Sequence, residues 1–451
     1  MYRILSCSGW LLLFGVLIPM GVAAEEPLTL RQAIQQAIEL SPEVKLAQAG
    51  SLEARANLSI ARNQLLPQVS FIEDISRGND PVYVFGSKLR QQRFATADFD
   101  VNELNRPTPL GNFSSRLVGS WMVFDSLRTQ KMIRSADLAR QSADSSAKAA
   151  DQKVALEVVQ AYQSVLYAER EIDLAQHEVE TAQALLDYVD DHVKAGLAVE
   201  SDRMSAQVNV AERKQALIAA EGELALAWAQ LRVAIGAPDL QQTKLQPIEP
   251  HNFTASALEQ EIEAAVKRRP DVKAISEAQS AQGSAVAASK WSYGPRVSAY
   301  GSAEQDRPTF TGGGGNNWVA GVQVSIDILP FSKRAQLLRE NAAKSRVDAQ
   351  LSMYQQQVRL QVSQAHIQRQ TAQLSLETSR AAIDQATESL RIVRNRYGAG
   401  LANITDLLRA EDAERQSQTT FWRSVYDNAT AYAQLLFATG TLTPEAAEEL
   451  Q

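Results

Sequence analysis

Cysteine and long apolar runs are scarce in this chain of 451 residues, and each scarcity removes a class of structure. The one cysteine, Cys7, lies before the first apolar run, so it cannot be the lipid-bearing residue of a lipoprotein. No cysteine follows it, which excludes disulfides and thiolate chemistry from the rest of the chain. After Val22 no apolar run reaches the roughly 20 residues of a spanning helix, so any membrane-spanning part would have to be β-structure.

Basic clusters and reactive constellations are lacking too. The formal charge is −7 and no run of lysines or arginines is longer than three residues, which argues against a nucleic-acid partner. The four histidines stand alone, without a second ligand at metal spacing, and no Gly-x-Ser-x-Gly motif is found. The sequence therefore predicts no enzyme activity, no bound metal and no cofactor. These isolated histidines are His177, His192, His251 and His366.

The first residues have the pattern of a secretory signal. Arg3 supplies a positive charge, an apolar run extends from Trp10 to Val22, and Ala23 and Ala24 end a small-residue cleavage site. We expect residues 1–24 to be a signal peptide and the mature chain to begin at Glu25.

Two internal matches show that the remaining chain is duplicated. Residues 193–202 align without a gap to residues 397–406, and the same offset of 204 continues to Gly236 and Gly440. Residues 30–70 match residues 258–298 at an offset of 228. Repeats of this kind are read before any single motif. We expect a first repeat at 25–236, a linker or equatorial segment at 237–255, a second repeat at 256–440 and a C-terminal tail at 441–451.

Each repeat begins with a helical pattern, and two alternating segments follow it. The first helical stretch runs from Leu30 to about Arg62 with Pro42 inside it. Polar and apolar residues then alternate after Pro67 and Pro295, and again in residues 116–123 and 317–328, although Ile72 and Glu73 break the first alternation. These segments are about as long as a tilted membrane strand. The other reading, amphipathic hairpins on a soluble domain, is less favoured because no other core is visible to receive them. The position of the loop at 78–112 stays open.

The rest of each repeat is a long helix, a glycine turn and a returning helix. A heptad pattern runs from Val154 to Val193 without interruption, and a weaker one continues through Leu390 to Tyr397. Residues 126–194 would form a helix of roughly 100 Å, and two shorter helices placed end to end would match its length. The sequence thus predicts a rod with four strands at one end and two glycine turns at the other. Four strands leave open edges, so oligomerisation is expected, and three copies would supply twelve strands.

At this point the chain resembles the TolC-type outer-membrane efflux proteins. The resemblance rests on the duplicated layout, on Pro67-Gln68-Val69 and Pro295-Arg296-Val297 before strands, and on a Gly-Leu pair at each tip with an aspartate five residues after the leucine. It implies a mainly α fold with a membrane β part: a homotrimer with a twelve-stranded barrel in the outer membrane and a helical tunnel in the periplasm. It also implies a periplasmic adaptor protein and an inner-membrane pump as partners.

The function implied by the resemblance is that of an exit duct for a tripartite efflux or type I secretion system. The alternative is a coiled-coil protein of the cell envelope that spaces its layers and conducts nothing. The four alternating segments discriminate between the two, because a scaffold has no need of strands with one polar face.

The resemblance also assigns candidate residues at the tips. Adaptor contacts fall on Gly196, Leu197, Gly400 and Leu401, and gate residues fall on Asp202, Tyr397, Asp406 and Arg409. Simpler roles stand beside these assignments, because a glycine there can end a helix with positive φ and an aspartate can cap the next one.

The correspondence with the family is incomplete. The family's gate arginine falls on Ala402, and one of its two acidic rings falls on Arg409. The network that closes the tip is therefore expected to differ in detail.

Overall fold

The computed structural model describes residues 27–248 and 257–446. The predicted signal peptide, His251, and parts of the predicted linker and C-terminal tail lie outside these residues, so they stay predictions. The first half contains α1 (Leu30–Leu40), α2 (Pro42–Asn63), β1 (Gln68–Gly78), α3 (Pro81–Arg90), the short η1 (Thr96–Phe99), α4 (Val101–Asn105), β2 (Leu110–Phe124), α5 (Arg128–Lys194) and α6 (Glu200–Ile235). The second half contains α7 (Leu258–Arg268), α8 (Pro270–Trp291), β3 (Arg296–Arg307), β4 (Gly315–Ser325), α9 (Phe331–Gly398) and α10 (Ile404–Thr439).

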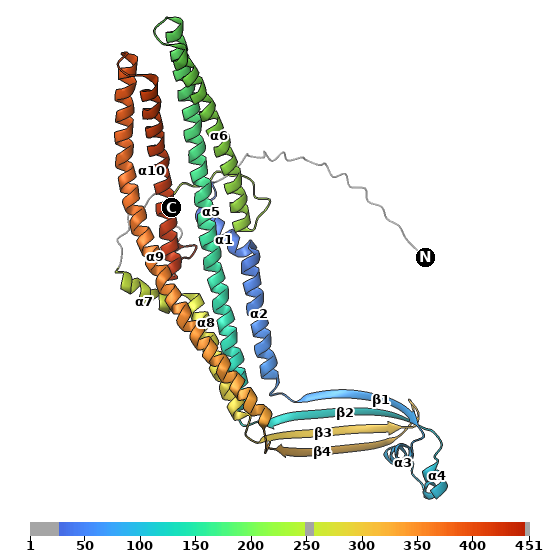
Figure 1. Cartoon of the computed structure of the whole chain (residues 1–451). Helices are drawn as coiled ribbons and strands as arrows, with labels where there is room; N and C mark the ends of the chain where they lie inside the picture. The colour runs from blue at the N-terminus through green and yellow to red at the C-terminus, as the bar shows by residue number, and fades with distance from the viewer. Residues whose placement is uncertain (1–26, 249–256, 447–451) are drawn as a thin grey trace, which may run out of the picture.

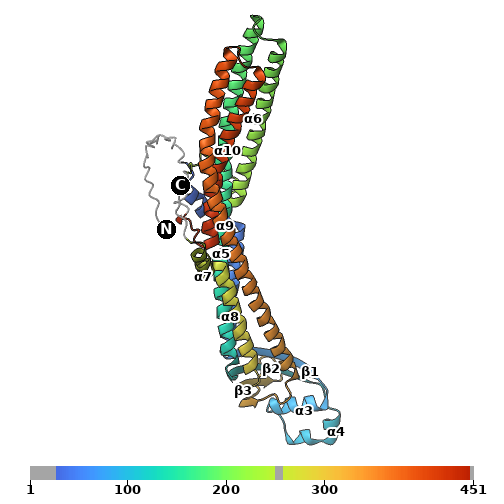
Figure 2. The same ribbon diagram turned by 60° about the vertical axis from the view of Figure 1, so that its left-hand side comes forward.

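The helices form a long rod, and the sheet turns aside from one end of it (Figure 1). Helix α5 has 67 residues and α9 has 68, so each is about 100 Å long. Helices α6 and α2 follow one another along α5, while α10 and α8 follow one another along α9, with the two tips together at the far end (Figures 1 and 2). The predicted rod is confirmed. Among the described helices, none is both long and apolar enough to cross a membrane.

One proline in each repeat divides its opening helical segment into two helices. Pro42 and Pro270 are the first residues of α2 and α8, a position that tolerates the missing N–H. The residue before a proline is pushed out of helical conformation, and Ser41 accordingly has ψ 129° and accepts a hydrogen bond from the Glu43 N–H at 3.2 Å. The helical stretch expected from Leu30 to about Arg62 is therefore two helices, with the break at Ser41.

The four strands form one antiparallel sheet in the order β1-β2-β3-β4. Its register places Phe71, Leu117 and Trp318 on one face, and Trp318 is 81% exposed there. Two details differ from the expected alternation. A register shift pairs Phe124 with Val297 and leaves out Val123, and β4 ends at Ser325, so the alternating residues beyond it lie outside the strand.

The break in alternation at Glu73 has a structural cause. Glu73 pairs with Ser115, which pairs with Gln305, so one polar row crosses the apolar face. Arg307 lies 3.2 Å from the Glu73 carboxylate, from Nη2 to Oε1, and neutralises it. On the opposite face, Arg116 and Glu304 form an ion pair at 3.3 Å. The charges of this sheet are thus largely paired.

The loop between β1 and β2 packs on the polar face of the sheet at its outer end. Gln91, just after α3, donates through Nε2 to the Asn112 side chain at 2.9 Å, and Asn112 donates to Asp306 at 2.7 Å. Asp306 is fully buried beneath this contact. The structure therefore settles what the sequence left open: residues 78–112 fold back against the sheet's polar side.

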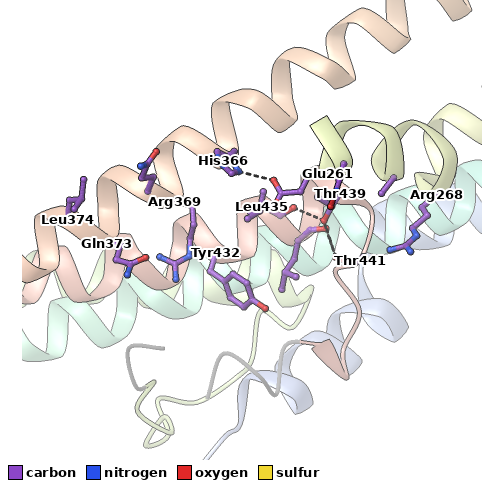
Figure 3. Close-up of a pocket in the computed structure, with 14 residues that line it drawn as sticks. Glu261, Arg268, His366, Arg369, Gln373, Leu374, Tyr432, Leu435, Thr439 and Thr441 are labelled. Atoms are coloured by element: carbon purple, nitrogen blue, oxygen red, sulfur yellow. Dashed lines mark hydrogen bonds and ion pairs between the residues drawn. The ribbon is translucent and has the colours of Figure 1, made fainter. Parts of the chain in front are cut away.

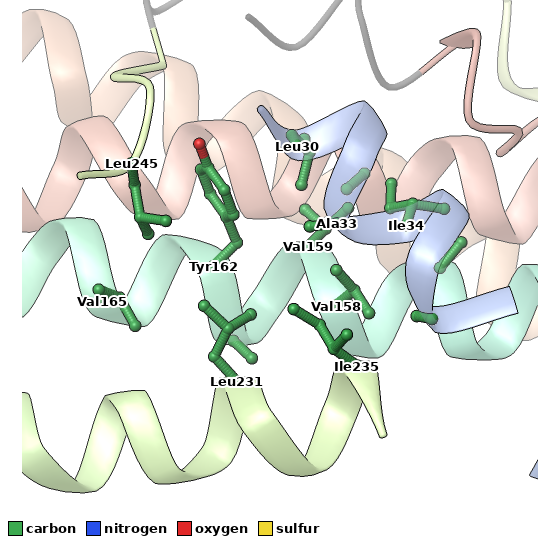
Figure 4. Packing of buried hydrophobic residues seen from close by; sticks show 14 of the residues in the cluster. Leu30, Ala33, Ile34, Val158, Val159, Tyr162, Val165, Leu231, Ile235 and Leu245 are labelled. Atoms are coloured by element: carbon green, nitrogen blue, oxygen red, sulfur yellow. The ribbon is translucent and has the colours of Figure 1, made fainter. Parts of the chain in front are cut away.

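The main apolar core lies at the waist of the rod, where α1, α5 and α6 meet (Figure 4). Val158 and Leu231 are completely buried in it, and the Tyr162 hydroxyl lies 2.7 Å from the Leu28 carbonyl oxygen. Every heptad position expected on α5 is buried or half-buried, which confirms the predicted seam. These positions are Val154, Val158, Ala161, Val165, Ala168, Ile172, Ala175, Val179, Ala182, Leu186, Val189 and Val193.

Candidate functional site

Both tips are built from the same helix-ending motif. Gly196 and Gly400 have φ of +75° and +72°, as expected for glycines that end a helix. The next residue turns back, so that the Leu197 N–H donates to the His192 carbonyl and the Leu401 N–H to the Arg396 carbonyl, each at 2.8 Å. This is the Schellman arrangement, which satisfies the last helical carbonyls.

The leucine at each tip projects into solvent. Leu197 is 76% exposed and Leu401 is 69% exposed. Arg396 also donates to the Leu401 carbonyl at 3.3 Å, which adds a side-chain tie at the second tip. The structure thus presents two fixed apolar side chains at the outermost points of the rod.

Tyr397 and Asp202 approach each other within one chain, just behind the tips. Burial raises the pKa of the Tyr397 hydroxyl, and the nearby Asp202 charge raises it further because both disfavour a phenolate. The Tyr188 ring lies 6.1 Å from the Tyr397 ring between centroids and 4.0 Å from the His192 ring. Two of the predicted gate residues therefore share a half-buried aromatic site that joins α5, α6 and α9.

Asp406 and Arg409 lie on the exposed side of α10, away from that site. Asp406 and Asn403 form a capping box, in which the Asn403 side chain accepts from the Asp406 N–H at 2.8 Å. Asp406 accepts in return from the Asn403 N–H at 3.4 Å. Within one chain, Asp406 therefore acts as a helix cap, and Arg409 follows close to one turn later on the same helix.

A set of charged residues packs between the two hairpins, and the sequence alone did not predict it. Glu178, Arg213 and Glu411 have side chains only 15%, 12% and 11% exposed. They line a cavity of about 250 Å³ between α5, α6, α9 and α10. One sequence feature could have indicated this set: Glu178 is a charged residue directly beside the seam position Val179.

A larger cavity of about 680 Å³ lies at the waist, between α7, α9 and α10 (Figure 3). His366 borders it and lies 2.9 Å from the Glu261 carboxylate, while the Arg369 guanidinium packs over the Tyr432 ring at 5.7 Å. His366 is thus one member of a side-chain pair, far from the tips.

A family model for outer membrane efflux proteins matches residues 33–237 and 262–441 of the chain. The chain belongs to the outer membrane efflux protein family. It is 24% identical over 441 residues to the outer membrane efflux protein BepC of Brucella suis, covering 96% of this chain and 90% of that protein. This membership places it in the outer membrane, with its helices forming a periplasmic tunnel.

Solved structures of outer membrane channels have the same fold. The CmeC outer membrane channel of Campylobacter jejuni superposes with a TM-score of 0.78 at 17% identity, covering 93% of this chain and 88% of that one. The open state of the MtrE channel of Neisseria gonorrhoeae gives 0.75 at 18% identity, with coverages of 92% and 91%. The family and the fold are those of channel proteins.

Proposed function

We propose that three copies of this chain form a passive exit duct, which a periplasmic adaptor and an inner-membrane pump engage and open. The duct catalyses no reaction. The two repeats at 25–236 and 256–440 serve as its two hairpin units, each carrying two strands of a twelve-stranded barrel. The observation that carries this proposal is that a single chain leaves matching surfaces open on both of its edges.

The open edges occur in the helices and in the sheet alike. Helix α6 packs on α5, α5 on α10 and α10 on α9, so α6 and α9 are the outer helices (Figure 1). Each outer helix exposes apolar residues at heptad spacing, which is the pattern of a helix awaiting a partner. Within the described residues, strands β1 and β4 are likewise unpaired on one side. The exposed stripes are Met204, Val208, Ala211, Ile218 and Ala225 on α6, and Met353, Leu360, Ile367 and Leu374 on α9.

The tips supply the docking and gating parts of the proposal. Leu197 and Leu401 are exposed apolar contacts suited to an adaptor hairpin. Tyr397 with Asp202 holds neighbouring helices together at the narrow end. Three copies of Asp406 form a carboxylate ring, which Arg409 partly neutralises, so the cation preference is weaker than two acidic rings would give.

The experiment that tests the assembly combines gel mobility with tryptophan quenching. Purified from outer membranes, the protein should run as a trimer that heating converts to monomer. In a variant retaining Trp318 as its one tryptophan, a lipid-soluble quencher should reduce fluorescence strongly, because that side chain is exposed on the apolar sheet face.

A variant retaining Trp228 is the matched control. Trp228 is 2% exposed in the waist core, so the same quencher should leave its fluorescence almost unchanged. A soluble monomer, or equal quenching of the two tryptophans, would contradict the proposed assembly.

A further inference from the structure

Six charged side chains meet between the two hairpins, and we call them the inter-hairpin charge cluster. Each of the four long helices contributes at least one of them. They are different residues from Tyr397 and Asp202, although Arg394 and Glu411 also line the cavity beside Tyr397. The members are Glu178 on α5, Arg213 on α6, Arg394 on α9, and Glu411, Asp412 and Arg415 on α10.

Two of its arginines connect the first hairpin to the second. Arg213 pairs with Asp412 across from α6 to α10, and also lies 3.8 Å from Glu178 on α5. Arg415 reaches back from α10, with Nε 3.9 Å from Glu178 Oε2 and 3.9 Å from Asp412 Oδ1. These contacts bind α10 to both helices of the first hairpin at once.

The cluster is partly buried, so breaking its ion pairs costs more than breaking ion pairs at the surface. Ion pairs at an exposed surface contribute little, but a charge that is mostly buried cannot be left without its partner at low cost. Arg213 and Glu178 are in that class, whereas Asp412 is 54% exposed at the edge of the cluster. Separating the hairpins therefore requires these pairs to be exchanged for water.

We propose that the inter-hairpin charge cluster is a second latch, which holds the two hairpins of one chain together and resists widening of the tip alongside the Tyr397–Asp202 site. Only the predicted effect of this latch on conductance rests on the proposed function. The closed contact itself is a property of the single chain and is tested separately.

The test is a double-mutant cycle read by spin labels on the two hairpins. The chain's one cysteine, Cys7, lies in the predicted signal peptide, so cysteines placed at the exposed Glu180 on α5 and Glu388 on α9 can be labelled selectively. Arg213→Gln and Asp412→Asn should each shift the distance distribution towards longer separations. The double variant should shift it by less than the two single effects combined, because both break the same contact.

Arg203→Gln is the matched control, since the ion pairs of Arg203 with Glu200 and Asp190 lie within the first hairpin. It should leave the distribution unchanged and combine independently with Asp412→Asn. Unchanged distances in the cluster variants, or purely independent effects of Arg213→Gln and Asp412→Asn, would overturn the latch. If Arg213→Gln fails to fold, the cycle is run with Arg415→Gln, whose side chain is 35% exposed.

Conductance separates this proposal from the function on which it rests. If the wild-type protein conducts in a planar bilayer, the Asp412→Asn channel should conduct more than the wild type. If no variant conducts, the duct function fails, and the spin-label distances alone still decide whether the latch exists.

Discussion

Leu197 and Leu401 are the residues proposed to dock the adaptor, and the backbone of each turn determines their position. Gly196 and Gly400 hold φ near +75°, a conformation that glycine adopts without steric cost. A Cβ at either glycine would meet no described atom within 4 Å, so their backbone angles alone call for glycine there. The leucine that follows each one is consequently held in a defined place by the turn and not by packing of its side chain.

Leu401→Asp is expected to abolish export while leaving the trimer intact. A carboxylate placed in an apolar contact with an adaptor would have to be desolvated without a partner, which is costly. Export is measured as survival against an effluxed toxic compound, and trimer content by gel. Val82→Asp, at a 79% exposed residue of the opposite end, is the control. Normal export by the Leu401→Asp variant would remove the tip from the docking surface.

The contact between the hairpins should respond to pH, because it contains the mostly buried carboxyl group of Glu178. Burial raises the pKa of its carboxyl group, while Arg415 and Arg213 oppose the shift. Glu171 on the same helix and Glu414 on α10 raise it further, and His177 also lines the cavity. If the hairpins part, the carboxylate reaches water and its pKa falls towards the ordinary value. Protons thus bind the closed arrangement more tightly, so acid favours closure even though the ion pairs weaken.

The expected outcome is a narrower distribution of hairpin distances as the pH is lowered from 7 to about 5. The same spin labels on Glu180 and Glu388 report it. Burial also raises the pKa of Glu411 in the same cluster, so two carboxyl groups contribute to the response. Glu178→Gln removes one of them and should reduce the response, and Glu178→Gln with Glu411→Gln should remove most of it. A distribution that broadens in acid would show that loss of the ion pairs outweighs the relief of burial.

The glycines that cap the returning helices α6 and α10 pack against the proline breaks. Gly236 has φ +77°, and a Cβ there would lie 3.1 Å from the Ser41 backbone. Gly440 has φ +74°, and a Cβ there would lie 3.1 Å from the Cα of Arg269. The duplicated glycines thus join each hairpin to the helix pair below it, and this explains why both copies contain glycine at this point.

Gly236→Ala should lower the free energy of unfolding by about 1 to 2 kcal/mol from the left-handed backbone alone. Crowding against Ser41 adds to this cost. Gly50→Ala is the matched control, because Gly50 lies inside α2 with no described atom within 4 Å of an added Cβ, and alanine there should stabilise by about 0.5 to 1 kcal/mol. Thermal unfolding of the two variants measures both effects. Equal midpoints would contradict the assigned backbone constraint.

Local patterns predicted most elements of this chain but not the contacts between hairpins. Heptad spacing located α5, and alternation located the four strands, because burial on one face leaves a period in the sequence. The bulge at Val123 and the early end of β4 left no such trace. The ion pair of Arg213 with Asp412 joins residues 199 positions apart, so no local pattern could reveal it. The roles of Asp406 and Arg409 stay predictions because they depend on neighbouring chains.

At the scale of the whole molecule, the chain is an open segment of a ring. Its outer helices α6 and α9 expose heptad stripes, and its described sheet ends in the unpaired edges of β1 and β4. Closing both kinds of edge at once requires copies related by rotation about a common axis. The rod then becomes the wall of a tunnel that is narrowest at the hairpin tips.

The most direct test of a gated duct is its single-channel conductance in a planar lipid bilayer. The wild-type trimer should conduct weakly, because the tips are closed. Tyr397→Phe combined with Asp202→Ala should raise the conductance several-fold, because it removes the proposed Tyr397–Asp202 link behind the tips while leaving the waist core intact. A channel whose conductance is the same in the wild type and this variant would contradict a gate at Tyr397 and Asp202, and a trimer that conducts in neither would contradict the duct itself.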